Sequence, residues 1–71
     1  MRRYKIVEEF GEKVQRFRKK QNLSQERLAE MVGVHRNHMG RIERGETNVS
    51  LVTVYRITQA LKATSKDLLP F

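Results

Sequence analysis

The segment GVHRNHMGRIERG, residues 33 to 45, gathers side chains that could contact a nucleic acid. Arginine can donate two parallel hydrogen bonds to the edge of guanine, and asparagine can pair in the same way with adenine. Arg36, Asn37 and Arg41 therefore carry the chemistry needed to distinguish bases. A solvated charged surface is the alternative for any one of these arginines.

Two histidines in the same segment raise the possibility of a metal site. His35 and His38 lie three residues apart, but the chain has no cysteine and no suitable carboxylate cluster beside them, so they make weak zinc ligands. No serine, histidine and acid arrangement is present, and no glycine-rich loop follows a strand. We therefore predict a protein that is not an enzyme and that needs neither a metal nor a cofactor.

The apolar residues of this segment indicate how its polar side chains are positioned. Met39 and Ile42 are three residues apart, so on a helix both face the core. The opposite face then consists of polar residues and one glycine, namely Arg36, Asn37, Gly40, Arg41 and Arg44. Gly40 costs about 1 kcal/mol relative to alanine within a helix, which would be explained by close approach of the backbone to DNA. We predict that Arg36, Asn37, Gly40 and Arg41 read bases.

Four further helices are predicted around this one. Phe10, Val14 and Phe17 recur at helical spacing and predict a helix over residues 10 to 21. Ser24 is an N-cap candidate for a second helix over residues 25 to 32, and Gly33 provides the positive φ for the turn that follows.

The C-terminal half repeats this pattern of capped helices. Residues 50 to 62 carry an apolar stripe and predict a fourth helix, the stripe being Leu51, Val54, Ile57 and Leu61. Thr64 and Asp67 have the spacing of a capping box, and Pro70 ends a fifth short helix. No strand pattern occurs, so the sequence predicts an all-α bundle of five short helices.

Length and charge narrow the function. With 71 residues the chain should be one domain, residues 1–71. Lys and Arg number 15 against 8 for Asp and Glu, a net charge of +7, which favours an acidic partner such as nucleic acid. The N-terminal stretch has no continuous apolar run, so we expect no membrane span and a cytoplasmic, nucleoid-associated protein.

The ordered set of motifs resembles the helix-turn-helix domain of phage repressors, Cro proteins and small bacterial regulators. It runs from about Phe10 to Leu69 and leaves residues 1–9 as an N-terminal extension. The residues that stand at the family's recurrent positions are Gln25, Leu28, Ala29, Gly33, Val34, Ile42, Glu43 and Gly45. The resemblance implies a compact five-helix, lambda-repressor-like bundle, in which helices two and three form the motif and helix three enters the major groove.

The resemblance also implies roles outside the recognition helix. Ser24 and Gln25, at the start of helix two, stand where a phosphate would bind, and a second phosphate clamp is implied at Arg44, Thr47 and Asn48. Arg18 and Glu43 resemble the family's internal salt bridge. His35, at the N-cap of helix three, and Thr58 depart from the residues that the family has more often.

We therefore expect a sequence-specific, double-stranded-DNA-binding transcription regulator, a repressor that binds an inverted-repeat operator as a homodimer. The predicted dimer interface consists of exposed apolar residues of helix four and the C-terminus, which are Val52, Tyr55, Leu69, Pro70 and Phe71. The alternative is an antitoxin-type or other protein-interaction module. Attachment to a membrane surface through RRYKIV and binding to RNA are less well supported.

Overall fold

The computed structural model describes residues 4–71. Met1 to Arg3 lie outside the described residues, and so does the start of the predicted extension and of the RRYKIV segment. Between residues 4 and 71 the chain forms helices and no strand, as predicted. The helices are α1 (Lys5–Lys20), α2 (Gln25–Val32), α3 (Arg36–Glu43), α4 (Leu51–Leu61) and α5 (Ser65–Leu68). The prediction of an all-α, five-helix fold is confirmed.

The first helix is longer than the sequence indicated. It begins at Lys5 and not at residue 10, so residues 5–9 of the predicted N-terminal extension are helical. Val7 lies three residues before Phe10 and continues its helical spacing, and the backbone amides of Val7 and Glu8 both donate to the carbonyl of Tyr4. Tyr4 provides no side-chain cap, which is why the usual signal of a helix start was missing.

The starts of α2 and α5 have their predicted caps. Ser24 and Thr64 each accept a backbone amide there, and Ser50 does the same at the start of α4. Gly33 has φ +86° and ends α2. The left-handed conformation is one that glycine adopts without steric cost, so this residue can turn the chain from α2 directly into α3.

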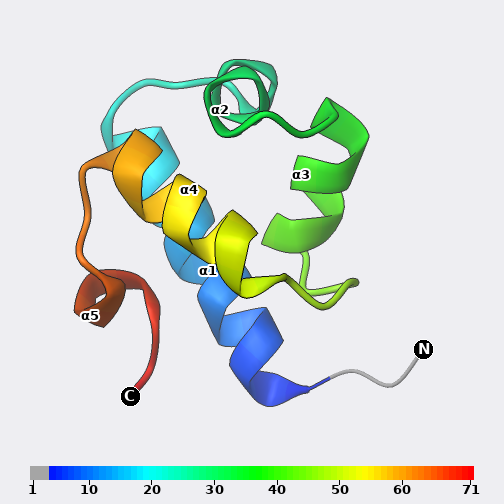
Figure 1. The fold of residues 1–71 in the computed structure, drawn as a ribbon, viewed down its shortest axis with the longest axis vertical. Coiled ribbons are helices and arrows are strands. Elements are labelled where there is room, and N and C mark those ends of the chain that lie inside the picture. Colours follow the sequence, from blue (N-terminus) through cyan, green and yellow to red (C-terminus); the bar gives the residue numbers. More distant parts are fainter. Residues whose placement is uncertain (1–3) are drawn as a thin grey trace.

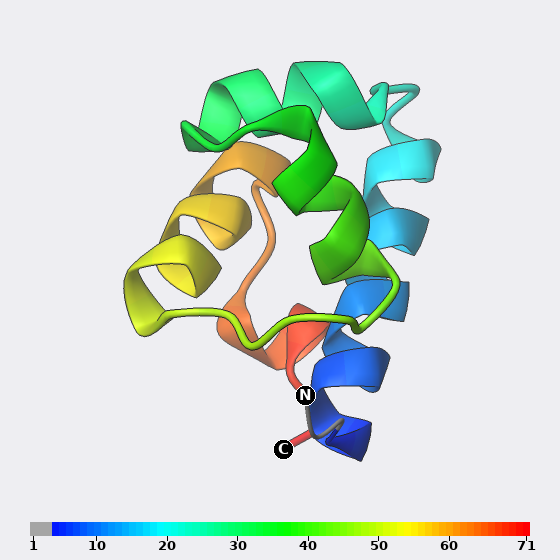
Figure 2. The same cartoon turned by 90° about the vertical axis from the view of Figure 1, so that its right-hand side faces the viewer.

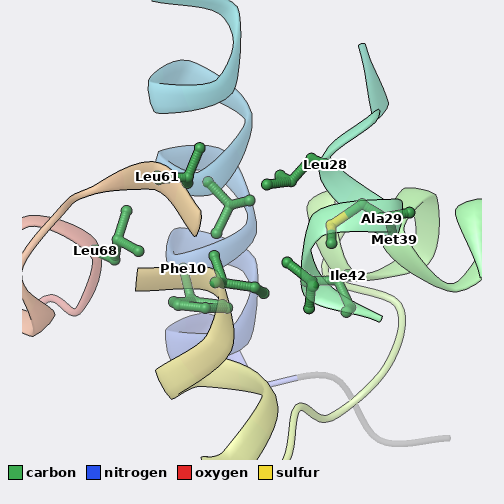
Figure 3. Packing of buried hydrophobic residues seen from close by; sticks show 10 residues of the cluster. Phe10, Leu28, Ala29, Met39, Ile42, Leu61 and Leu68 are labelled. Carbon is green, nitrogen blue, oxygen red and sulfur yellow. The ribbon is translucent and has the colours of Figure 1, made fainter. Parts of the chain in front are cut away.

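The helices surround a single apolar core. α2 packs on α3 and α4, and α1 contacts α3, α4 and α5 (Figure 1). Figure 3 shows the side chains that meet at the centre. The buried apolar residues are Phe10, Val14, Leu28, Ala29, Val32, Met39, Ile42, Ile57, Leu61 and Leu68. Each helix thus contributes to the core, and burial of its apolar face holds it in place.

One residue of the predicted apolar stripe on α4 is not in the core. Leu51 is 83% exposed, whereas Ile57 and Leu61 are buried and Val54 is half-buried against the core. Leu51 is the first residue of α4, at the end of the helix that follows the exposed Ser50 cap. Helical spacing gives the face of a residue but not how far the neighbouring helices extend, so the prediction for Leu51 was wrong.

Candidate nucleic-acid interface

The exposed face of α3 carries the side chains predicted to read bases. Figure 2 shows α3 in front of the rest of the bundle, with α2 across the top. Arg36, Asn37 and Arg41 are exposed, whereas Met39 and Ile42 on the opposite face are fully buried. For these five residues the predicted division of α3 into a buried apolar side and an exposed polar side is confirmed.

The first turn of α3 is fixed by its cap and by a surface ion pair. Nδ1 of His35 accepts the backbone amide of Asn37 at 3.1 Å, so histidine replaces the more usual hydroxyl as N-cap. Nη1 of Arg36 lies 3.5 Å from Oε2 of Glu26 on α2, and both side chains are about two-thirds exposed. At this distance and exposure the pair contributes little to stability, so Arg36 is free to exchange Glu26 for another acceptor.

Gly40 does not belong to the exposed strip. It is buried, and a β-carbon at this position would lie 3.1 Å from Nη1 of Arg44 and 3.5 Å from Oε1 of Gln25. The side chains of Gln25 and Arg44 therefore lie over this part of the helix, so the expectation of an exposed Gly40 was wrong. Its contact with bases stays a prediction.

The start of α2 brings the first pair of predicted phosphate-binding residues beside α3. The hydroxyl of Ser24 accepts the amide of Arg27 at 3.0 Å, which confirms its capping function. Gln25 is half-buried, and its Nε2 donates to Oε1 of Glu43 at 2.9 Å. One amide hydrogen of Gln25 is thereby used inside the protein, and the other polar groups of the side chain remain for a ligand.

The end of α3 carries the second predicted clamp. Nε and Nη2 of Arg44 donate to the two carboxylate oxygens of Glu46, at 2.9 and 3.2 Å. These hydrogen bonds and the charge of Glu46 raise the pKa of Arg44 above its ordinary value. Thr47 donates weakly to the carbonyl of the exposed Asn48, at 3.4 Å.

The salt bridge implied between Arg18 and Glu43 is present and buried. Nε and Nη2 of Arg18 donate to Glu43 at 2.7 and 3.1 Å, and Nη1 donates to the carbonyl of Leu23 at 2.8 Å. The Glu43 side chain is 1% exposed. Together with Gln25, this pair joins α1, the α1–α2 loop, α2 and α3, so it fixes the position of α3 in the bundle.

Sequence reasoning missed a residue that determines how close α3 lies to α1. A β-carbon at Gly11 would lie 2.7 Å from the carbonyl oxygen of Glu43. Such contact with backbone cannot be relieved by a side-chain rotation, so α1 and α3 can pack this closely only with glycine at position 11. The signal was a glycine within a helix whose neighbouring residues otherwise favour helix formation.

Sequence reasoning also missed Glu26 and Glu46, the partners of Arg36 and Arg44. Glu26 is ten residues from its partner, a spacing that the arrangement of two helices determines. Glu46 is only two residues from Arg44, but the pairing depends on the turn at Gly45, which has φ +71°. Neither pair has the three- or four-residue spacing that brings side chains together on one helix.

The predicted dimer residues differ in how they are covered. Val52, Tyr55, Pro70 and Phe71 are exposed, and Phe71 is 81% exposed. Leu69 is half-buried against its own core, contrary to the expectation that nothing in its own chain covers it. It lines an open apolar hollow of about 190 Å³, together with Ile6, Val7, Phe10, Val49 and Val54.

Two other kinds of site do not occur in the described part of the chain. Within residues 4–71 no three His, Cys, Asp or Glu residues are grouped so that they could hold a metal ion. Over the same residues no helix is long and apolar enough to cross a bilayer.

The motif and its neighbours match a known family. A helix-turn-helix family model matches residues 14–69. The chain belongs to the helix-turn-helix family of Cro/C1 type. Its members are DNA-binding transcription regulators and not enzymes, so both of these predictions are confirmed.

Individual relatives extend this match over most of the chain. Control protein C.BamHI of Bacillus amyloliquefaciens is 48% identical over 63 residues, which are 87% of this chain and 78% of that protein. Control protein C.SmaI of Serratia marcescens is 44% identical over 64 residues, covering 90% and 76%. The restriction-modification controller protein C.AhdI from Aeromonas hydrophila is 36% identical in sequence. Its crystal structure matches this one with a TM-score of 0.88 over 93% of this chain and all of that chain.

A repressor bound to DNA has the same fold. The P22 c2 repressor, crystallised with a synthetic operator, is 31% identical with a TM-score of 0.80, covering 86% of this chain and 92% of that chain. The helix-turn-helix regulators thus share this bundle over nearly its whole length, which confirms the predicted fold class.

Proposed function

We propose that this protein reads an operator through Arg36, Asn37 and Arg41 and represses transcription from it. The observation that carries this proposal is the exposed strip of α3, whose guanidinium and amide groups have no structural function in the core. The guanidinium of Arg41 has no hydrogen-bond or ion-pair partner within residues 4–71. Its five N–H donors are therefore available for the O6 and N7 acceptors of guanine.

The phosphate contacts would come from residues on either side of this strip. Ser24 and Gln25 lie at the N-terminal end of α2, where backbone amides and the helix dipole favour an anion. Arg44, Thr47 and Asn48 lie where α3 ends. Contacts of this kind fix the register of α3 in the groove and do not depend on sequence.

We further propose that the operator is an inverted repeat bound by a homodimer. One recognition helix reads only a few base pairs, so two copies are needed for useful specificity. Leu51, Val52, Tyr55 and Phe71 are exposed apolar residues, and an apolar hollow lies beside α4 and the C-terminus. In a dimer with a two-fold axis, the same apolar surface of each subunit would be covered by the other subunit. Pro70 and the partly covered Leu69, which the sequence also placed in the interface, would lie at the edge of this surface.

The relatives support a more specific biological setting. C.BamHI and C.SmaI are control proteins, and C.AhdI is a restriction-modification controller protein. By analogy with them, this protein regulates the genes of a restriction-modification system in the cytoplasm, in association with the nucleoid. No feature of residues 4–71 favours the alternative of a toxin-binding module.

Selection of bound fragments from random duplex DNA tests the proposal. An inverted repeat with half-sites about 10 base pairs apart is expected, because this spacing places two recognition helices on one face of DNA. The selected site should also occur upstream of restriction or methyltransferase genes in the genome that encodes the chain, and should lower expression of a reporter when the protein is present. A single asymmetric site, or no enriched sequence, would contradict the proposal.

The proposed dimer surface is tested by placing a charged side chain within it. Leu51→Glu and Phe71→Glu change exposed residues and should leave the helical content intact while producing a monomer in sedimentation. Each variant should bind the full operator no better than an isolated half-site, since the gain from two linked contacts is lost. Gln59→Glu on the exposed side of α4 serves as the control for added charge. A dimer that persists in both variants places the interface elsewhere.

A further inference from the structure

The turn after α3 holds Glu46 at a fixed place beside the end of the helix. Gly45 adopts φ +71°, and the amide of Glu46 donates to the carbonyl of Arg41 at 2.9 Å. A β-carbon at Gly45 would lie 2.8 Å from the Cα of Glu8, so the turn packs directly against α1. The carboxylate that follows this glycine is therefore attached to a backbone with little freedom to move.

Glu46 in turn fixes the orientation of the Arg44 guanidinium. The hydrogen bonds use Nε and one N–H of Nη2 on one edge of the group. Both N–H groups of Nη1 and one of Nη2 have no partner among residues 4–71. Nη1 lies over the helix, 3.1 Å from the position that a β-carbon of Gly40 would take. Without a side chain at Gly40, the guanidinium can lie across the last turn of α3.

We propose that Glu46 is a positioning residue for DNA binding, which holds Arg44 with its unused N–H edge ready for a backbone phosphate. This inference rests on the proposed phosphate contact of Arg44. In this proposal Glu46 makes no DNA contact of its own and influences binding through Arg44.

A carboxylate beside Arg44 could also have the opposite effect and weaken DNA binding, by competing with the phosphate for the guanidinium. The geometry favours positioning for two reasons. Three N–H donors stay unused, and two of them form the Nη1/Nη2 edge, so a phosphate can bind bidentately there without displacing Glu46. In addition, an arginine held in one orientation before binding loses less side-chain freedom when it meets its ligand.

The decisive variant keeps the negative charge at position 46 and shortens the side chain that carries it. Glu46→Asp retains the carboxylate but shortens the side chain by one methylene, so it can no longer form both hydrogen bonds from the same backbone position. The probe is a random-sequence 30-base-pair duplex, because phosphate contacts do not depend on sequence. Glu30→Asp, which shortens the exposed partner of Arg27, is the matched control.

If Glu46 positions Arg44, affinity for this duplex should fall by about two- to tenfold in Glu46→Asp and stay unchanged in Glu30→Asp, with the thermal midpoint of both near that of the wild type. The loss should disappear in an Arg44→Ala background, because no guanidinium is left to position. A rise in affinity in Glu46→Asp would show competition and overturn the proposal. An equal loss in the Arg44→Ala background would do the same.

The experiment also separates this inference from the function on which it rests. Arg44→Ala alone should weaken binding and make its salt dependence less steep, by about 0.9 in the logarithmic slope for each phosphate that the protein no longer neutralises. If Arg44→Ala binds like the wild type, the proposed phosphate-binding role of Arg44 is wrong, and the inference falls with it. If Arg44→Ala weakens binding and Glu46→Asp does not, only the inference is wrong.

Discussion

Two arginine–glutamate pairs of this protein have similar geometry and different surroundings. In the buried pair, Nε of Arg18 lies 2.7 Å from Glu43, and in the exposed pair, Nε of Arg44 lies 2.9 Å from Glu46. Each is a two-point contact between a guanidinium and a carboxylate. Arg18 and Glu43 are nearly inaccessible to water, whereas the Arg44 side chain is 57% exposed.

Burial decides what each pair can do. The buried carboxylate of Glu43 accepts from both Arg18 and Gln25, and no buried side-chain nitrogen or oxygen between residues 4 and 71 lacks a partner. A ligand therefore has no access to it. The exposed pair keeps unused donors at the surface, where they can meet a phosphate. Similar chemistry thus fixes the fold at the buried pair and is available for binding at the exposed pair.

The largest expected effect comes from breaking the buried pair. Arg18→Met or Glu43→Gln should lower the free energy of unfolding by about 3–5 kcal/mol, because either change leaves a buried charge without its partner. Glu46→Gln should change it by about 1 kcal/mol or less, as is usual for exposed pairs. Thermal unfolding of the three variants measures the difference, and equal shifts would show that burial does not distinguish the pairs.

A smaller effect is expected on DNA binding by the exposed arginines of α3. Arg36→Ala or Arg41→Ala should cost about 1–3 kcal/mol on the selected operator and relax discrimination at one position in each half-site. Arg44→Ala should instead weaken binding to all sequences alike. Titrations with operator and random duplex measure both. A loss of the same factor on the two duplexes for Arg36→Ala would remove Arg36 from the base-reading set.

A still smaller effect is expected at Gly40, next to the exposed pair. Gly40→Ala should stabilise the protein by up to about 1 kcal/mol through helix propensity, because the new methyl group would displace the end of the Arg44 side chain by a few tenths of an ångström and no backbone atom. Affinity should fall slightly and equally for operator and random duplex. If only the operator loses affinity, the backbone of Gly40 approaches the bases, as the sequence first indicated.

The smallest effect concerns the capping box of α5 and its dependence on pH. The backbone amide of Thr64, and then its hydroxyl, hold the pKa of Asp67 below its ordinary value of 3.8. Because the pKa is lower in the folded state, the stabilisation is present above pH 3.8 and is lost as the pH falls through the folded-state value. Asp67→Asn should reduce the acid sensitivity of unfolding below this pH. An unchanged acid profile would show that the cap contributes nothing measurable.

Features that depend on a few neighbouring residues could be predicted from the sequence. Ser24 and Thr64 cap their helices, and Gly33 turns the chain, because each acts on backbone groups within about one turn. Arg18 and Glu43, 25 residues apart, were paired only through the resemblance to a family. Nothing in the spacing of these two residues indicates a contact.

Features that depend on where one helix meets another could not be predicted. Gly40 has the spacing of the exposed strip, but the side chain of Gln25 from α2 and that of Arg44 cover it. Leu51 has the spacing of the core and lies beyond it. Helical periodicity specifies the direction in which a side chain leaves its helix axis. Whether that side chain is buried depends on which residues of other helices lie in that direction.

The contact at Gly11 fixes the position of α3 against α1, and this position does not depend on the exposed side chains of α3. Backbone meets backbone there, and the remaining anchors of α3 are Met39, Ile42 and Glu43 on its inner side. Substitutions at positions 36, 37 and 41 leave all of these contacts in place. If these three side chains read bases as proposed, a new target preference could evolve or be engineered by changing them alone, without altering the helices that carry them.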